Sequence, residues 1–143
     1  MISHPSRTIL EYVWIGGRNE LRSKTRVVNA CPTSDPSHIP EWNYDGSSTW
    51  QADSNGDTEI ILKPCAIYKD PFRDIDDSSC LLVLCDTYDT NGNLTSSNHR
   101  HLANKLFEKS EHCKPWFGLE QEYFIILPES SLCKICCLNP DDL

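Results

Sequence analysis

The sequence has no long apolar run. None of its hydrophobic stretches approaches the roughly 20 residues of a membrane-spanning helix. Basic charge is also scarce, because 13 Lys and Arg stand against 21 Asp and Glu, and no basic patch typical of nucleic-acid binders is visible. Residues 1–8 lack the apolar core of a secretory signal. We therefore expect a soluble cytoplasmic protein with no membrane and no nucleic-acid partner.

Several catalytic and nucleotide motifs are also missing. The chain contains no Gly-x-x-x-x-Gly-Lys-Ser/Thr loop, no Gly-x-Gly-x-x-Gly fingerprint and no serine nucleophile elbow. These absences argue against a P-loop nucleotide site, a Rossmann dinucleotide site and a serine hydrolase of the usual type.

Cysteine, in contrast, is abundant, with eight residues in 143. Because no secretory signal is visible, we expect reduced thiols rather than disulfides. Cys65, Cys80 and Cys85 lie in or beside apolar runs, where a free cysteine packs as a small hydrophobe. Cys31 and Cys113 fall in predicted loops.

Hydrophobic patterning predicts a mainly β unit up to about residue 90. Residues 9–15 and 21–28 are predicted strands joined by a Gly-led turn, which makes a hairpin. After a proline-containing loop at 29–40, residues 41–49 show no clean period. A short strand at 58–64 is expected to stop at Pro64, although 66–68 can continue it. The nearly continuous apolar run at 80–88 predicts a central strand buried on both faces.

The second part of the chain predicts one helix and one more strand. Ser96, Ser97 or Asn98 can cap the helix, and its apolar face is expected to consist of Leu102, Ala103, Leu106 and Phe107. Aromatic and β-branched residues at 116–127 predict a buried strand. Residues 128–143 show no element that packs. The expected fold class is α+β.

Glu120 and Glu122 are the main candidates for a metal site. On a strand they would share one face, about 7 Å apart. Two like charges on an apolar strand repel each other and lose hydration, so a divalent cation is a plausible partner. The alternative is two solvated glutamates on the open face of an edge strand. An open face would alternate polar and apolar residues, and only Gln121 adds to the polar set.

Asp45 is the next candidate. Its aromatic neighbours could place it at a sheltered edge, where it could attract a cation or accept a proton. The alternative is a turn, since Asp45-Gly46 is a good turn pair and the hydroxyl residues after it can satisfy the local backbone.

Two other possible metal sites are weaker. His99 and His101 do not share a helix face at i, i+2 spacing. Cys133-x-x-Cys136 has the spacing of half a zinc site, but the predicted strand separates it from His112-Cys113. Exposed thiols on a disordered tail, including Cys137, are the simpler interpretation.

Taken together, several segments occur in the order found in glutamine synthetases of the eukaryotic type, which the chain resembles over roughly residues 9–127. The matching segments are Glu11-Tyr12-Val13-Trp14-Ile15-Gly16-Gly17, Leu21-Arg22-Ser23-Lys24, Pro40-Glu41-Trp42-Asn43-Tyr44-Asp45-Gly46-Ser47-Ser48-Thr49, Leu62-Lys63-Pro64, Lys69-Asp70-Pro71-Phe72-Arg73, Leu84-Cys85-Asp86-Thr87-Tyr88, Asn98-His99-Arg100-His101 and Pro115-Trp116-Phe117-Gly118-Leu119-Glu120-Gln121-Glu122-Tyr123.

The resemblance implies a β-grasp domain at 9–90 after an extension at 1–8, then the start of a catalytic domain at 91–127 and an unmatched tail at 128–143. It implies ligation of ammonia to glutamate with ATP, through a γ-glutamyl phosphate. Glu120 and Glu122 match metal-binding glutamates for Mg²⁺ or Mn²⁺, and Glu120 also lies beside the nucleotide phosphates. Asp45 matches an aspartate that crosses a subunit interface to hold ammonium and take its proton, in a homo-oligomer of stacked rings.

The chain departs from the family at two places. Trp50 stands where the family often has glycine or another small residue. From about residue 128 the match stops, as in a truncated or frameshifted product, so we expect a chain that lacks most of the catalytic domain and is inactive alone. The alternatives are a non-catalytic β-grasp module that associates with intact synthetase subunits, or a small zinc protein.

Overall fold

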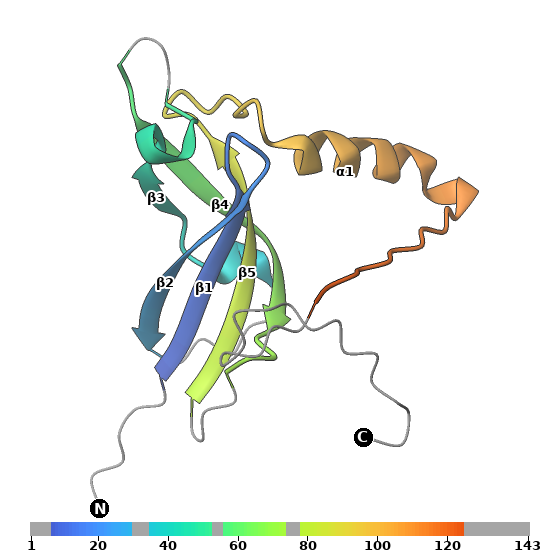
Figure 1. Ribbon diagram of the computed structural model, residues 1–143, viewed down its shortest axis with the longest axis horizontal. Coiled ribbons are helices and arrows are strands. Elements are labelled where there is room, and N and C mark those ends of the chain that lie inside the picture. Colours follow the sequence, from blue (N-terminus) through green and yellow to red (C-terminus); the bar gives the residue numbers. More distant parts are fainter. Residues whose placement is uncertain (1–6, 30–34, 53–55, 74–77, 125–143) are drawn as a thin grey trace, which may run out of the picture. The chain divides into compact units, whose positions relative to one another are not determined.

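The sheet contains five strands in the order β2-β1-β5-β4-β3 (Figure 1). The computed structural model describes residues 7–29, 35–52, 56–73 and 78–124. The strands are β1 (Arg7–Ile15), β2 (Leu21–Asn29), β3 (Trp42–Asp45), β4 (Glu59–Lys69) and β5 (Ser78–Tyr88). β1 and β5 pair in parallel, and the other neighbours are antiparallel. With the helix α1 (His99–Ser110), this mixed sheet confirms the α+β prediction, the hairpin and the central position of the 80–88 strand.

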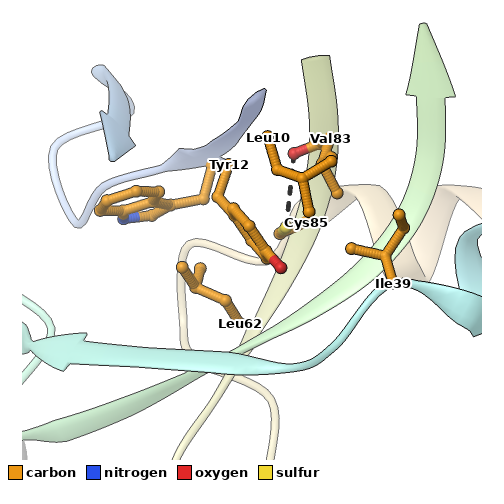
Figure 2. Close-up of a cluster of buried hydrophobic side chains, with 7 residues drawn as sticks. Leu10, Tyr12, Ile39, Leu62, Val83 and Cys85 are labelled. Atoms are coloured by element: carbon orange, nitrogen blue, oxygen red, sulfur yellow. Dashed lines mark hydrogen bonds between the residues drawn. The ribbon is translucent and has the colours of Figure 1, made fainter. Parts of the chain in front are cut away.

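The core lies on one face of the sheet and comes from alternate residues. Leu10, Tyr12 and Trp14 of β1 are buried because successive side chains of a strand point to opposite faces. Figure 2 shows Leu10, Tyr12, Leu62 and Val83 directed toward one another, with Ile39 from the loop before β3 beside them. On β5, Val83 and Cys85 are buried while Leu82 and Leu84 are half-buried. The predicted burial of this strand on both faces is therefore only partial, and it is greater on the face of Val83 and Cys85.

The sheet curls around this core, so that its two edge strands contact each other through side chains. The Tyr12 and Trp42 ring centroids lie 5.3 Å apart. Lys24 of β2 donates from Nζ to the Asn43 carbonyl of β3 at 2.8 Å. Its ammonium also lies 3.6 Å from the centroid of the Trp42 ring. These contacts bring Trp42 and Asn43, the first two residues of the strand that ends at Asp45, close to β2.

β4 does not stop at Pro64, so the expected stop is wrong and the alternative, a continuation through 66–68, holds. The strand continues to Lys69 with a register shift between Pro64 and Ala66. Its pairing with β3 ends at Leu62. A proline lacks an N–H, and it is tolerated where a strand edge is unpaired or beside a bulge; both conditions hold at Pro64.

Residues 41–49 form two elements where the sequence shows no period. β3 places Trp42 and Tyr44 toward the core and leaves Asn43 and Asp45 exposed. The short 3-10 helix η2 (Gly46–Thr49) follows at once. Four residues are too few for a period-2 pattern to stand out in a sequence. A second 3-10 helix, η1 (Pro36–His38), interrupts the predicted loop at 29–40.

The helix α1 begins after the third of its candidate caps. The His101 N–H donates to Oδ1 of Asn98 at 3.4 Å, the contact of an N-cap side chain with the third helical residue. Leu102 and Leu106, on the predicted apolar face, are 56% and 64% exposed. No described helix is long and apolar enough to cross a membrane.

Residues 110–143 form a separate unit, which we describe by itself. Its described part is the 3-10 helix η3 (Glu111–Cys113) followed by residues 114–124 without regular secondary structure. The prediction of a strand is therefore wrong for 116–124, and 125–127 lie outside the described residues. A strand needs a partner for its backbone hydrogen bonds, and none of the described residues pairs with this segment.

Candidate functional site

Asp45 ends β3 and caps η2. Its Oδ1 accepts the Ser47 N–H at 2.9 Å. Hydrogen bonding from Ser47 lowers the pKa of the Asp45 carboxyl below its ordinary value. The side chain is exposed, so of the two interpretations of the sequence the turn holds and the sheltered edge does not: Tyr44 points toward the core and its neighbour Asp45 points outward. The result is an anionic carboxylate open to solvent.

The backbone around Asp45 is tied to the β1–β2 turn. Gly46 donates its N–H to the Thr58 carbonyl at 2.6 Å, and Gly17 donates to the Thr49 carbonyl at 2.8 Å. A Cβ on Gly17 would lie 2.3 Å from the Trp50 carbonyl oxygen, so only glycine allows this approach. The two turns therefore form one closely packed tip beside Asp45.

Trp50 has a left-handed backbone, with φ 60 and ψ 32. A side chain costs energy in this conformation and glycine does not, which gives a physical reason to prefer glycine here. The Trp50 ring is 61% exposed. Its centroid lies 3.6 Å from the guanidinium carbon of Arg18, and a cation–π contact of this kind offsets part of the backbone cost.

Glu120 and Glu122 lie on the segment without regular secondary structure, and both are exposed. Among the described residues, no three His, Cys, Asp or Glu side chains are grouped so that they could hold a metal ion. Carboxylate oxygens suit Mg²⁺ and Mn²⁺, so the donor chemistry of the two glutamates fits, while the coordination shell in the described part is incomplete. Asp45 and these glutamates belong to different units.

The fold itself explains the positions of His101 and of the three cysteines in the sheet. His101 Nδ1 lies 3.7 Å from Oδ2 of Asp86, whereas His99 is exposed. Cys80 and Cys85 are buried free thiols, as predicted, and Cys65 is half-buried. Burial raises the pKa of the Cys65 thiol to about 11. Cys31, Cys133, Cys136 and Cys137 lie outside the described residues.

Sequence reasoning missed the residues that hold the Asp45 loop in place. Gly17, Arg22 and Gln51 reach the loop from other elements or from its far end. Arg22 Nη2, for example, donates to the Ser48 carbonyl at 3.3 Å. Such contacts join residues distant in the sequence and leave no local pattern. The Trp50 departure was the one visible signal at this place.

Sequence comparison relates the chain to glutamine synthetases. No family model matches. A protein of Acanthamoeba polyphaga mimivirus, provisionally named glutamine synthetase, is 52% identical over 128 residues, covering 88% of this chain and 35% of that protein. The nodule isozyme of Lupinus angustifolius and the chloroplastic leaf isozyme of Hordeum vulgare are each 48% identical over 123 residues. They match 84% of this chain, and the match covers 38% and 27% of those proteins.

A solved structure shows a weaker likeness. The cryo-EM structure of Plasmodium falciparum glutamine synthetase matches 76% of this chain and 20% of that chain, with a TM-score of 0.46 and 14% identity. That score adds nothing to the sequence relationship. The chain spans about a third of the length of the curated relatives it matches. By its sequence, the chain belongs to the glutamine synthetase family.

Proposed function

We propose that this chain serves the ATP-dependent ligation of ammonia to L-glutamate, through a γ-glutamyl phosphate, as part of a glutamine synthetase. The carrying observation is identity of 46–52% to glutamine synthetases over 84–88% of the chain. In this proposal residues 9–90 are a β-grasp domain and 91–127 begin the catalytic domain. The hairpin β1–β2 beside the parallel central pair of β1 and β5 supports that assignment.

Asp45 is the catalytic residue of the proposal. A lowered pKa keeps its carboxylate ionised at neutral pH, so it can attract ammonium by charge. In the proposal the same carboxylate also takes the proton from ammonium. Its exposure suits a site that a second subunit completes. We therefore propose a homo-oligomer, with stacked rings as the arrangement that the resemblance implies.

Glu120 and Glu122 would hold Mg²⁺ or Mn²⁺, with Glu120 also next to the nucleotide. A bound divalent cation supplies charge neutralisation at phosphate oxygens. Since two carboxylates are a thin shell and the described residues add no third donor, we propose that the chain alone does not turn over.

A chimera tests this function. Residues 9–127 would replace the equivalent segment of the lupin relative, and glutamine formation from ATP, glutamate and ammonia would be measured. We expect an active chimera and a loss of about 10²–10⁴-fold with Asp45→Asn, which keeps the cap and removes the charge. Asp35→Asn is the matched control, because Asp35 caps η1 through an equivalent contact with Ser37 at 2.9 Å.

Three outcomes would contradict the proposal. An assembled but inactive chimera would refute the function of the segment. Equal activity of Asp45→Asn and Asp35→Asn would remove Asp45 from catalysis. Glutamine formation by the purified 143-residue chain would refute its inactivity.

Glu120→Gln and Glu122→Gln should raise the Mn²⁺ concentration required by the chimera, and Glu108→Gln on the helix surface should not.

A non-catalytic module that binds intact synthetase subunits is the second candidate. The exposed apolar side chains of α1, such as Leu102 and Leu106, favour it, because contiguous exposed apolar surface marks interaction sites. Co-elution of the chain with the lupin enzyme on size exclusion supports this candidate. Separate elution of a lone monomer excludes it.

We propose the cytoplasm as the compartment. The cytosolic isozyme 1-1 of Oryza sativa, 48% identical over 123 residues, supports it, while the barley relative is named chloroplastic. Fractionation with an antibody against the chain decides between the two compartments.

A further inference from the structure

Gln51 connects three parts of the fold through one side-chain amide. Its Oε1 accepts the Tyr44 hydroxyl at 2.5 Å. Its Nε2 donates to the Ile15 carbonyl at 3.1 Å and to Oγ of Ser97 at 2.9 Å. These partners lie on β3, at the end of β1 and in the loop before α1, and two of them are 36 and 46 residues away in the sequence. Both amide N–H groups and the amide oxygen are thus used.

The backbone of the same residue closes the Asp45 loop. The Gln51 N–H donates to the Gly46 carbonyl at 2.9 Å, and the Ala52 N–H donates to the same oxygen at 3.2 Å. Gly46 itself is buried, and a Cβ there would lie 2.6 Å from Cγ1 of Ile60. The residue after Asp45 is therefore held by hydrogen bonds through both its N–H and its carbonyl, and its position has no room for a side chain.

Asp45 has little else to orient it. Among the described residues, its carboxylate accepts hydrogen bonds from Ser47, two residues on, and from Thr58, the residue before β4. The direction of the exposed carboxylate consequently depends on the backbone of residues 44–46. Gln51 contacts both ends of that stretch, the Tyr44 hydroxyl through its side-chain amide and the Gly46 carbonyl through its backbone N–H.

We propose that Gln51 is a positioning residue for Asp45: its side-chain amide ties the Tyr44 hydroxyl to the end of β1 and to Ser97, and so fixes the direction of the neighbouring carboxylate. The inference rests on the proposed role of Asp45 in ammonium binding. Glutamine suits the task because it offers two donors to Ile15 and Ser97 and an acceptor to Tyr44. Leucine has a similar size and offers neither.

The test uses the full 143-residue chain and compares two equivalent carboxylates by NMR. Asp45 and Asp35 each cap a 3-10 helix by accepting an N–H two residues on, at 2.9 Å in both cases. In Gln51→Leu we expect the pKa of Asp45 to move up toward its ordinary value and the Ser47 amide to exchange at least about tenfold faster. The pKa of Asp35 and the exchange rate of the Ser37 amide should not change.

Two results would overturn the inference. One is that Gln51→Leu leaves the pKa of Asp45 and the exchange rate of the Ser47 amide unchanged. The other is that the pKa of Asp35 and the exchange rate of the Ser37 amide change equally, which would indicate a general loss of stability. If Gln51→Leu fails to fold, Gln51→Asn provides the same comparison. It keeps the amide and shortens the side chain by one methylene, so it cannot reach all three partners.

The chimera separates this inference from the proposed function. We expect Gln51→Leu to raise the KM for ammonia by about tenfold, a change that Asp35→Asn would not produce. If Asp45→Asn leaves glutamine formation intact while the NMR change at Asp45 is seen, the catalytic role fails and the positioning holds. If Asp45→Asn abolishes activity and Gln51→Leu alters neither readout, only the positioning fails.

Discussion

Replacing Arg100 with methionine should destabilise the chain by about 2–3 kcal/mol, because it leaves a buried carboxylate without its cation. Arg100 donates from Nε and Nη2 to the two oxygens of Asp86, each at 2.7 Å. Asp86 lies on the central strand β5 and its side chain is only 7% exposed. The pair joins the first turn of α1 to the sheet, together with the Asn98 amide, which donates to the Thr87 carbonyl at 3.0 Å.

The magnitude follows from how each partner is exposed. Removing one member of a fully buried ion pair costs about 3–5 kcal/mol, whereas an exposed pair contributes about 0–1 kcal/mol. Arg100 is 35% exposed, so water already hydrates part of its guanidinium. The cost therefore lies between the two limits.

Urea unfolding followed by circular dichroism measures the change. With a slope of about 1–3 kcal/mol per molar urea, a loss of about 2–3 kcal/mol should lower the midpoint by roughly 0.7–3 M. Lys105→Met is the matched control. It removes a long cation from an exposed position of the same helix and should change the free energy of unfolding by less than about 0.5 kcal/mol.

The double variant Asp86→Leu/Arg100→Met identifies the cause. With no charge left in the buried position, most of the lost stability should return. A double variant as unstable as Arg100→Met would show that lost packing, rather than the unpaired carboxylate, causes the effect. An Arg100→Met variant no less stable than Lys105→Met would refute the reasoning altogether.

Three further predictions concern single positions and use the same unfolding measurement. Gly46→Ala should lower the free energy of unfolding by about 1–3 kcal/mol, because the added Cβ would lie 2.6 Å from Ile60. The control Gly118→Ala should leave the stability unchanged, because nothing lies within 4 Å of the new Cβ. Equal effects of the two substitutions would contradict the close packing at Gly46. The Trp50→Gly variant should be more stable than Trp50→Ala by about 1 kcal/mol. Both variants lose the ring, and only glycine adopts the left-handed backbone at φ 60 without strain. A more stable alanine variant would exclude backbone strain at this position. Burial acts to raise the pKa of Glu11, but hydrogen bonds from neighbouring hydroxyls and a guanidinium outweigh it and lower the pKa. The stability that ionised Glu11 contributes is therefore complete above the unfolded-state pKa and is lost as the pH falls through the folded-state pKa. The difference in unfolding free energy between the native chain and Glu11→Gln should consequently become smaller below about pH 4. A difference that stays constant with pH would argue against the effect.

Local patterns predicted the elements whose register is clear over a whole segment. The alternation of Leu10, Tyr12 and Trp14 marks one buried face of β1, and the apolar run at 80–88 marks the central strand. The helix was visible from its spacing, and Asn98 was among its candidate caps. These features depend on neighbouring residues, which a reader of the sequence sees together.

The failures occur where a distant partner determines the local structure. β4 passes through Pro64 because its pairing with β3 ends at Leu62, which the local sequence of β4 does not reveal. The apolar residues at 116–124 have strand propensity, yet propensity forms no strand without a partner for the backbone hydrogen bonds. For Asp45 the sequence left a sheltered edge and a turn open, and only the structure decided for the turn, because β3 turns Tyr44 inward and Asp45 outward.

The sequence by itself determined the family of this protein, the type of most of its elements and the identity of its candidate carboxylates. These are properties of residue types and of short spacings, which do not depend on how distant parts of the chain come together. Only the tertiary structure decided that β5 lies between β1 and β4, that Asp45 stands exposed, and that Gln51 reaches Ile15 and Ser97. Those contacts join residues dozens of positions apart, and they exist only after the sheet has brought the strands together.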